Sequence, residues 1–500
     1  GDAWQPCTES RFGHCDLLVA GGGPAGLTAS LVAARAGMRV MLVDDGMFFG
    51  GRLVGDAATL DGKPAGLWVD GVLAELRSCV NVRVLGRSSV WGYHEHNLVT
   101  VLERNPVDAP GLDLRNWKIR AAQVIVAAGA IERPIAFANN DRPGVMLASA
   151  VRSYVNQYAV MPGRCAVVFA NTDSAYGTAG DLALYGASVQ VVDPRPEAAP
   201  DLLDAARALG VSCHIGAQVR KAFGGRRVEA VEVVDAPSPP SRLNCDLLAS
   251  SGGWNPAIHL ASQSRLARVI WSDVVQSFVA VPTSRHLQLA GAANGVFALS
   301  RCLEDGGRAG AAAVTEWGGS NAPIVLPMAL DEPCSVGAPL WAVAQGRRRD
   351  KVFVDFSGDV TTADLGLAIR EGFDSIELIK RYTTAGMGVD QGKTGNLNVV
   401  GVVGAMTGVA PAAVGTTTFR PPFVPVEFGA IAGARSGAQM FPWRHTPLTD
   451  WHLAHGAVMV DAGMRWQRPG YYPERGESWK EAAERAALAV RNAVGVVDGT

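Results

Sequence analysis

The sequence predicts an α/β protein with two Rossmann-like dinucleotide-binding units. Three observations lead to this fold class. A Gly-x-Gly-x-x-Gly turn joins a predicted strand to a predicted helix near the start of the chain. A strand–helix–strand segment of the same spacing recurs 149 residues later, with Ala170 in the place of Gly21. After Gly318 the pattern changes, because a Gly/Asn/Pro-rich linker leads into short helices.

Length and composition are those of a large globular protein. The chain has 500 residues, of which 48% are hydrophobic, so about two to four domains are expected. The formal net charge is −2 and no basic patch is interleaved with aromatic residues, which argues against nucleic acid as a partner. The uncharged run Val399–Gly415 is shorter than the roughly 20 residues of a membrane span, so no membrane association is expected.

No metal site or nucleophile is predicted. The eight cysteines form no CxxC and have no metal-ligand spacing, so we expect free thiols and a cytoplasmic location. His445, His452 and His455 are interpreted as structural residues. No GxSxG motif is present, and the catalytic residues are left unassigned.

The first unit carries the phosphate-binding motif. The apolar run Leu17–Ala20 predicts a buried strand, and Gly21, Gly23 and Gly26 follow it. The first glycine permits a tight turn, the second lets the backbone approach a pyrophosphate, and the third lets the helix pack closely on the strand. The phosphates are expected at the helix N-terminus, where unpaired N–H groups and the helix dipole favour anions.

An acidic residue ends the second strand of this unit. A carboxylate at Asp44 accepts hydrogen bonds from ribose hydroxyls and repels a 2′-phosphate, so NAD or FAD is expected in preference to NADP. Two later strands end in small-residue turns at Ala127–Ala130 and at Gly291–Gly295, as in dinucleotide-binding enzymes. The predicted nucleotide-binding residues are Gly21, Gly23, Pro24, Ala25, Gly26, Asp44, Asp45, Gly51, Arg52, Ala128, Gly129 and Gly291.

The second unit keeps the spacing of the first without its glycines. Ala170, Thr172 and Ala175 occupy the glycine positions, and Asp193 corresponds to Asp44. Asp173 would also face a phosphate. We therefore expect a Rossmann fold here without tight dinucleotide binding.

Two short helices are predicted beyond the linker. Thr361 and Asp364 form a capping box before an apolar helix face, and Gly372 ends that helix. A second helix is expected to begin at Asp374. The loop Arg381–Thr394 that follows combines cationic side chains, hydroxyl groups and glycine amides, which suits a phosphate. A solvated turn between two helices is the alternative interpretation of this loop.

The last segment of the chain predicts one more helix. Ser478 and Glu481 form a capping box, and the helix is expected to run into a strand at Val494.

Nine segments together resemble one family, the large α subunits of heterotetrameric sarcosine oxidases. The segments are GGGPAGL, AAGAIERP, NNDRPGVMLA, FANTDSAY, SGGWNP, FVDFSGDVTTAD, KRYTTAGMGVDQGKT, GTTTFRPP and TPLTDWH. The resemblance extends almost from end to end. It implies two glutathione-reductase-like Rossmann domains, a small helical module of the ferredoxin-associated kind that lacks a cluster, and the beginning of an aminomethyltransferase-like α+β domain. It also implies that the chain is incomplete at both ends.

Domain boundaries follow from the same resemblance. In more distant amine and opine oxidases the helical module carries four cysteines for an iron–sulfur cluster, and Asp355, Ser357, Asp390 and Gly395 stand there in this chain, so no cluster is expected. The expected domains are 1–160 with 246–317 for the NAD/FAD-type Rossmann domain, 161–245 for the degenerate one, 318–350 for a linker, 351–420 for the helical module at the FMN and subunit interface, and 421–500 for the incomplete folate-binding domain.

The resemblance implies a set of cofactors and partners. NAD is expected in the first Rossmann unit, FMN at an interface with a β subunit, and FAD on that β subunit, while small γ and δ subunits complete the heterotetramer. The implied reaction is oxidative demethylation of sarcosine to glycine, with O2 reduced to H2O2. The one-carbon unit passes to tetrahydrofolate, or leaves as formaldehyde without folate, and the folate site of this chain is incomplete. The residues expected to hold FMN are Arg381, Thr383, Thr384, Gln391, Lys393 and Thr394.

Three alternatives remain open from the sequence. The chain could be a subunit of an N-methylglutamate dehydrogenase or an opine oxidase, which differ in substrate and electron acceptor. It could be a self-contained FAD- or NAD(P)H-dependent oxidoreductase, which would bind flavin in the first unit without a partner. It could also be a non-catalytic scaffold subunit, which would bind no nucleotide.

Overall fold

The computed structural model describes residues 6–235, 237–321, 323–330, 338–344, 350–433 and 442–495. Two compact units make up the chain, residues 1–431 and 432–500, and each is described by itself. Cys334 and part of the predicted linker 318–350 lie outside the described residues. Among the helices that the structure describes, none has the length and apolar character needed to cross a membrane.

A seven-stranded sheet forms the core of the first Rossmann unit. Its strand order is β5-β2-β1-β8-β7-β6, and β21 also pairs with β8. The pairs β5–β2, β2–β1, β1–β8 and β8–β21 are parallel, whereas the pairs β6–β7 and β7–β8 are antiparallel. The strands are β1 (Thr8–Ala20), β2 (Val40–Val43), β5 (Val82–Leu85), β6 (Ser88–His94), β7 (Leu98–Arg104), β8 (Leu114–Val126) and β21 (Leu287–Leu289).

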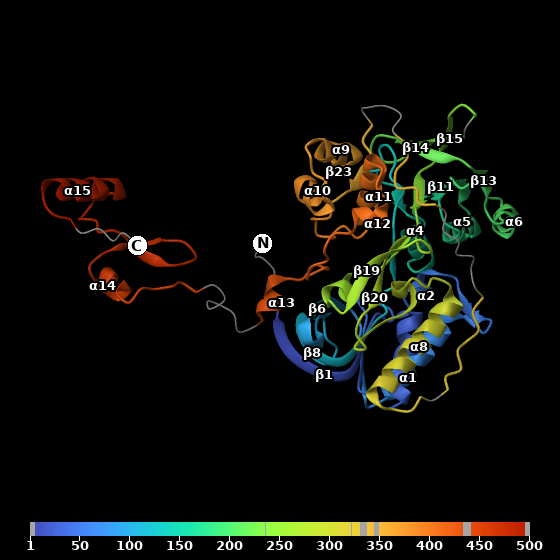
Figure 1. Cartoon of the computed structure of the whole chain (residues 1–500), viewed down its shortest axis with the longest axis horizontal. Coiled ribbons are helices and arrows are strands. Elements are labelled where there is room, and N and C mark those ends of the chain that lie inside the picture. The colour runs from blue at the N-terminus through green and yellow to red at the C-terminus, as the bar shows by residue number, and fades with distance from the viewer. Residues whose placement is uncertain are drawn as a thin grey trace. The chain divides into compact units, whose positions relative to one another are not determined.

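Strand β1 begins at Thr8, nine residues before the predicted start. Its first half is mostly polar and exposed, so a search for apolar runs finds only the fully buried end. That first half pairs with β8 from Thr8 opposite Leu114 onward. The long β1–β8 pair is the curved edge at the lower left of the main body in Figure 1.

Two helices pack side by side on one face of this sheet. They are α1 (Pro24–Arg35) and α8 (Leu299–Trp317), seen together at the bottom of Figure 1. A Cβ atom on Gly306 would lie 2.3 Å from the Ala25 carbonyl oxygen, and one on Gly310 would lie 2.8 Å from that of Ala29. The two glycines of α8 therefore permit the close approach that places α8 beside the glycine-rich turn.

The second Rossmann unit contains a five-stranded parallel sheet. Its order is β10-β17-β11-β12-β13. The strands are β10 (Val145–Leu147), β11 (Cys165–Ala170), β12 (Ser188–Asp193), β13 (Ser212–Ile215) and β17 (Leu247–Ser251), with helices α4 (Ala148–Asn156), α5 (Ser174–Leu184) and α6 (Pro200–Ala208). Both β10 and β17 lie outside the predicted segment 161–245, so those limits cut through this sheet. The physical reason is that β17 is entirely buried between β10 and β11, where it completes the parallel core.

The helical module follows the predicted linker 318–350. It contains β22 (Phe353–Asp355), β23 (Val360–Thr361), α9 (Thr362–Arg370), α10 (Ile376–Thr383), α11 (Asn396–Thr407) and α12 (Pro411–Val414). The capping box of Thr361 and Asp364 is confirmed. Helix α10 begins after Ser375 rather than at Asp374. Helix α11 was not predicted, because it is apolar on all sides and has no 3.6-residue polar period.

The remaining helices and strands of the first compact unit lie between or after these elements. They are α2 (Arg52–Gly55), β3 (Thr59–Leu60), β4 (Lys63–Pro64), α3 (Ala65–Ser78), η1 (Glu95–Asn97), β9 (Ala130–Glu132), β14 (Gln218–Phe223), β15 (Ala230–Val234), β16 (Ser241–Asn244), β18 (Trp254–Pro256), α7 (His259–Gln263), β19 (Ala267–Ser272), β20 (Ser277–Pro282), η2 (Gly291–Asn294) and α13 (Phe428–Ala432).

The C-terminal unit is small and mostly exposed. It contains α14 (Thr449–Ala454), the antiparallel pair β24 (Val458–Asp461) and β25 (Gln467–Tyr471), and α15 (Trp479–Asn492). The predicted capping box of Ser478 and Glu481 is confirmed. The predicted strand at Val494 is wrong for residues 493–495, which form no strand, and its remaining residues lie outside the described ones.

Candidate functional site

Two positions of the glycine-rich turn between β1 and α1 have no room for a side chain. Gly21 adopts φ +113°, and a Cβ there would lie 2.2 Å from the Ala127 carbonyl oxygen. A Cβ on Gly26 would lie 1.9 Å from the carbonyl oxygen of Gly21. The turn, the strand β8 and the helix α1 therefore touch through bare backbone, and both positions require glycine.

The N-terminus of α1 is open. Gly23 is its N-cap, no side chain caps it, and its first turn holds no acid. A Cβ on Gly23 would have its nearest neighbour, the Gly51 Cα, 3.9 Å away. The first N–H groups of a helix have no partner within the helix, so those of Ala25 and Gly26 are available to an anion.

Predicted residues from distant segments gather around this helix start. A Cβ on Gly51 would lie 3.0 Å from the Gly23 Cα, and one on Gly291 would lie 2.8 Å from the Ala25 Cβ. The backbone nitrogen of Ala128 lies 3.1 Å from the position that a Cβ added to Gly21 would occupy. Gly129 adopts φ +74°, and a Cβ there would have no neighbour within 4 Å. The fold thus brings together most of the residues predicted to bind the nucleotide.

Asp44 holds the turn from the opposite side. One carboxylate oxygen accepts a hydrogen bond from the Gly22 N–H at 2.6 Å, and the other accepts one from the Gly46 N–H at 2.8 Å. Burial raises the pKa of Asp44 above its ordinary value, although these two bonds act in the opposite direction. The neighbouring Asp45 is exposed. The carboxylate of Asp44 therefore shapes the loop in addition to any contact that it makes with a ribose.

Arg52 and Gly291 are anchored by acids that the sequence did not indicate. Arg52 donates to Asp56 at 2.7 Å and to the Phe297 carbonyl at 2.9 Å. The N–H of Gly291 donates to Asp305 at 2.9 Å, a residue of α8. No motif marks Asp305, because it is an acid in an ordinary amphipathic helix, and only the packing of α8 on α1 places it here.

The equivalent position in the second unit is occupied by an ion-pair network. Asp193, the counterpart of Asp44, is fully buried and accepts hydrogen bonds from Arg195 and from the hydroxyl of Tyr176 at 2.8 Å. Arg195 also donates to Asp173 at 2.6 Å. The acid that would face a ribose and the acid at the start of α5 are thus joined by one guanidinium. That the second unit binds no dinucleotide tightly stays a prediction, for which this network offers a physical reason.

In the helical module, the four positions predicted to have lost a cluster lie close together. Asp355 accepts hydrogen bonds from the N–H groups of Gly358 and Gly386. A Cβ on Gly395 would lie 3.7 Å from the Asp355 Cα, and one on Gly388 would lie 2.4 Å from the Ser357 Cβ. In the parts of the chain that the structure describes, no group of three or more His, Cys, Asp or Glu residues is arranged to hold a metal ion.

In the loop Arg381–Thr394, some of the predicted FMN residues are hydrogen-bonded to nearby backbone, and others are exposed or line cavities. Thr383 donates to the Ile379 carbonyl at 2.8 Å, and Gln391 donates to the Gly388 carbonyl at 2.9 Å, so both stabilise the loop itself. Arg381 and Thr384 are exposed. Lys393 and Thr394 line two different cavities, so the six residues predicted to hold FMN do not converge on one point.

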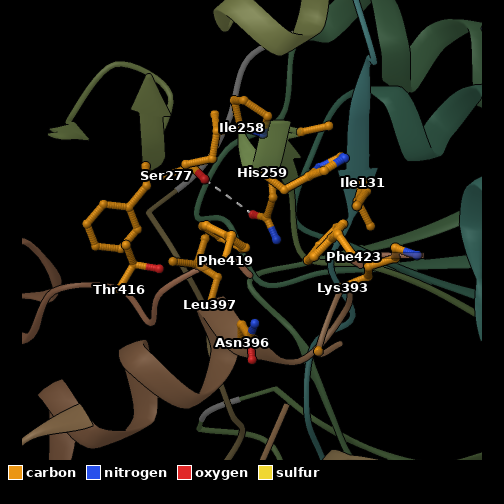
Figure 2. Close-up of a pocket in the computed structure, with 15 residues that line it drawn as sticks. Ile131, Ile258, His259, Ser277, Lys393, Asn396, Leu397, Thr416, Phe419 and Phe423 are labelled. Carbon is orange, nitrogen blue, oxygen red and sulfur yellow. Dashed lines mark hydrogen bonds between the residues drawn. The ribbon is translucent and has the colours of Figure 1, made fainter. Parts of the chain in front are cut away.

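Lys393 enters a pocket that sequence reasoning did not find. The pocket lies where the module meets the first Rossmann unit, and Figure 2 shows Lys393 and His259 gathered around the Phe423 ring. The His259 ring stacks on Phe423 with centroids 4.1 Å apart, and the Lys393 ammonium lies 5.1 Å from the same ring centre. The lining residues are Ile131, Asn255, Pro256, Ala257, Ile258, His259, Ser277, Phe278, Gly392, Lys393, Asn396, Leu397, Thr416, Phe419 and Phe423.

Burial and the nearby Lys393 charge lower the pKa of His259 from 6.5 to about 3. The folded chain therefore keeps this imidazole neutral while the unfolded chain binds a proton below about pH 6.5, so stability falls as the pH falls through this window. We expect His259→Gln to reduce the pH dependence of the free energy of unfolding, measured by urea denaturation below pH 6.5, by up to about 1.4 kcal/mol per pH unit. His286→Gln, at an exposed histidine, serves as the control and should keep the wild-type slope. An unchanged slope in His259→Gln would show that this ring does not control acid stability.

Three protein families match segments of the chain. Residues 16–127 match the family described as FAD dependent oxidoreductase. Residues 349–435 match the Sarcosine oxidase A3 domain, and residues 448–500 match the GCVT N-terminal domain.

Whole-chain relatives agree with these segments. The chain is 42% identical to the α subunit of sarcosine oxidase from Rhizobium meliloti (strain 1021), over 98% of this chain and 49% of that protein. It is 25% identical to an opine oxidase subunit from Rhizobium meliloti, over 83% of this chain and 87% of that protein. The chain therefore spans about half the length of the sarcosine oxidase relative.

A solved structure shares the fold. The L-proline dehydrogenase from P. horikoshii superimposes with a TM-score of 0.66, covering 85% of this chain and 80% of that one at 21% identity. At that identity the likeness concerns the arrangement of the elements alone.

Proposed function

We propose that this chain is the nucleotide-binding part of a flavin-dependent sarcosine oxidase. The premise is that the chain, which spans roughly half of the length of the sarcosine oxidase α subunits, belongs to their family over that half. The chain has a flavin-oxidoreductase fold, and its family consists of subunits, so it acts within an assembly. The proposed reaction is oxidation of sarcosine to glycine, with O2 as the electron acceptor and H2O2 as a product.

The observation that carries the proposal is the open start of α1. A phosphate-binding helix needs free N–H groups, no capping side chain and close backbone packing behind it, and all three occur at Gly21–Gly26. We propose that this site holds the pyrophosphate of NAD, with Gly51, Ala128 and Gly129 along its walls. Asp44 would face the ribose from the end of β2. A bound NAD would supply a redox-active nicotinamide, and the chain contributes the binding and orientation.

FMN is proposed to meet the chain at the loop of the helical module. Arg381 and Thr384 are exposed there, and Asp355 accepts hydrogen bonds from Gly386 in the loop and from Gly358 in the turn between β22 and β23. Arg381 and Thr384 would bind the FMN phosphate at the contact with a β-type subunit that carries FAD and the sarcosine pocket. Because Lys393 points into the internal pocket, we assign it there and keep Arg381 as the cationic residue that donates hydrogen bonds to the FMN phosphate. Residues 448–500 would begin the folate-binding domain that receives the one-carbon unit.

Arg381→Ala is expected to lower FMN content when the full chain is produced together with a β-type subunit. Loss of a charge-assisted hydrogen bond of about 1.5–3 kcal/mol corresponds to roughly tenfold or more weaker binding. FMN per complex, measured after extraction, checks this, and Arg370→Ala, an exposed arginine at the end of α9, is the matched control. Full FMN occupancy in Arg381→Ala would remove the loop from the proposal.

The activity has its own test. The same co-purified complex should form H2O2 from sarcosine, and it should release both NAD and FMN on denaturation. Flavin bound in the first site of the chain alone would favour the self-contained oxidoreductase, and turnover with an opine but not sarcosine would favour the opine oxidase alternative.

A further inference from the structure

The pocket between the module and the first Rossmann unit has no acidic residue in its lining. It is walled by apolar side chains, with Ile131 from β9, Leu397 from α11 and Phe419 beyond α12. Its polar lining comes from Lys393, Asn255, His259, Ser277, Asn396 and Thr416. A pocket whose lining contains a cation and no acid favours an anionic occupant.

Lys393 supplies the charge. It is half-buried, and in the described part of the chain no carboxylate lies within ion-pair distance of its ammonium group. Asp45 and Asp390 act on it only as more distant charges. Burial lowers the pKa of Lys393, which is the response of an ammonium group that has lost water without gaining a close anion.

A second buried cation lies directly behind the pocket. Arg133 is 1% exposed and donates through Nη1 to the side-chain oxygen of Asn255 at 2.9 Å. Its Nη2 is buried without a hydrogen-bond partner. Ser277 lies 3.5 Å from the same Asn255 oxygen. Since that oxygen is already an acceptor, Asn255 is left with its amide N–H groups for the pocket, and these also suit an anion.

His259 offers one more unused group. Its Nδ1 is buried and has no hydrogen-bond partner, while the ring is held against Phe423. A buried polar atom without a partner costs free energy, so its presence in a pocket wall points to a ligand that supplies the missing contact.

The cavity volume limits the occupant to a small molecule. It is about 60 Å³, and one water needs about 10–15 Å³ on this measure, so roughly four to six non-hydrogen atoms fit. We propose that this pocket binds a short-chain carboxylate, with the carboxylate on Lys393 and Asn255 and its hydrocarbon part against Ile131 and Leu397. The apolar walls disfavour a doubly charged phosphate, which needs donors on every side.

The test uses the full chain and sodium acetate as the probe. Isothermal titration should show saturable binding of acetate and none of acetamide, which has the same shape without the charge. In Lys393→Met the affinity for acetate should fall at least about tenfold, whereas Lys393→Arg should retain part of it. Lys63→Met, at an exposed lysine of β4, should bind as the wild type does.

Several outcomes would overturn the proposal. They are equal binding of acetamide, wild-type acetate binding by Lys393→Met, and tighter binding of inorganic phosphate than of acetate. The nucleotide content of each variant, measured on the same sample, reports on the first Rossmann site independently. Loss of acetate binding with nucleotide retained concerns this pocket alone, and absence of nucleotide with acetate binding intact concerns the proposed function alone.

Discussion

Replacing Arg195 by methionine is expected to destabilise the chain by about 3–5 kcal/mol. Asp193 is fully buried and Asp173 nearly so, and both carboxylates bond to this one guanidinium. Without it, two negative charges remain in the core of the second Rossmann unit with their main cationic partner removed, and burial of an unpaired charge is among the costliest changes a core can undergo.

Urea denaturation of the full chain measures this effect. Arg207→Met is the matched control in the same unit, because its pair with Asp204 is 68% and 72% exposed and exposed pairs contribute only about 0–1 kcal/mol. Asp173→Asn added to Arg195→Met should recover part of the lost stability by removing one buried charge. Equal denaturation midpoints for Arg195→Met and Arg207→Met would show that the network is not what holds this unit together.

Replacing Gly26 by alanine is expected to abolish nucleotide binding and to cost about 1–3 kcal/mol of stability. The new methyl group would lie 1.9 Å from the Gly21 carbonyl oxygen and 3.3 Å from the Ala127 Cβ. Neither neighbour is a flexible side chain that can move aside, so α1 must shift away from β1. The N–H groups that would hold the pyrophosphate shift with it, so almost no nucleotide should remain bound.

Gly66→Ala is the control for this change. Gly66 lies in the exposed first turn of α3, and a Cβ there would meet nothing within 4 Å. It should leave nucleotide binding unchanged and stabilise the helix by about 0.5–1 kcal/mol. Bound nucleotide retained in Gly26→Ala would mean that the turn is not the phosphate site.

The parts of the fold that sequence could predict share a local cause. Gly26, which packs against the Gly21 carbonyl, and the capping box of Thr361 with Asp364 act within five residues of the chain, so their spacing alone indicates the structure. The family resemblance extended this to the order of the domains, and the comparisons bear out both the α/β fold class and the family.

The parts that sequence could not predict depend on long-range packing. Helix α11 has no polar face to give it a period, and β17 joins the second sheet from beyond its expected end. Asp305 reaches Gly291 only because α8 packs on α1. The pocket at Lys393 joins residues more than 130 positions apart, and no local sequence pattern indicates that they lie together.

The most direct test of the central claim is to identify the nucleotide released from the chain. The full chain, co-produced with a β-type subunit, is denatured, and the released adenine dinucleotide is quantified by mass spectrometry for the wild type and for Gly26→Ala. We predict one NAD per wild-type chain and almost none for Gly26→Ala, with Gly66→Ala equal to the wild type. A wild-type chain that releases no adenine dinucleotide, or a Gly26→Ala chain that releases as much as the wild type, would contradict the account.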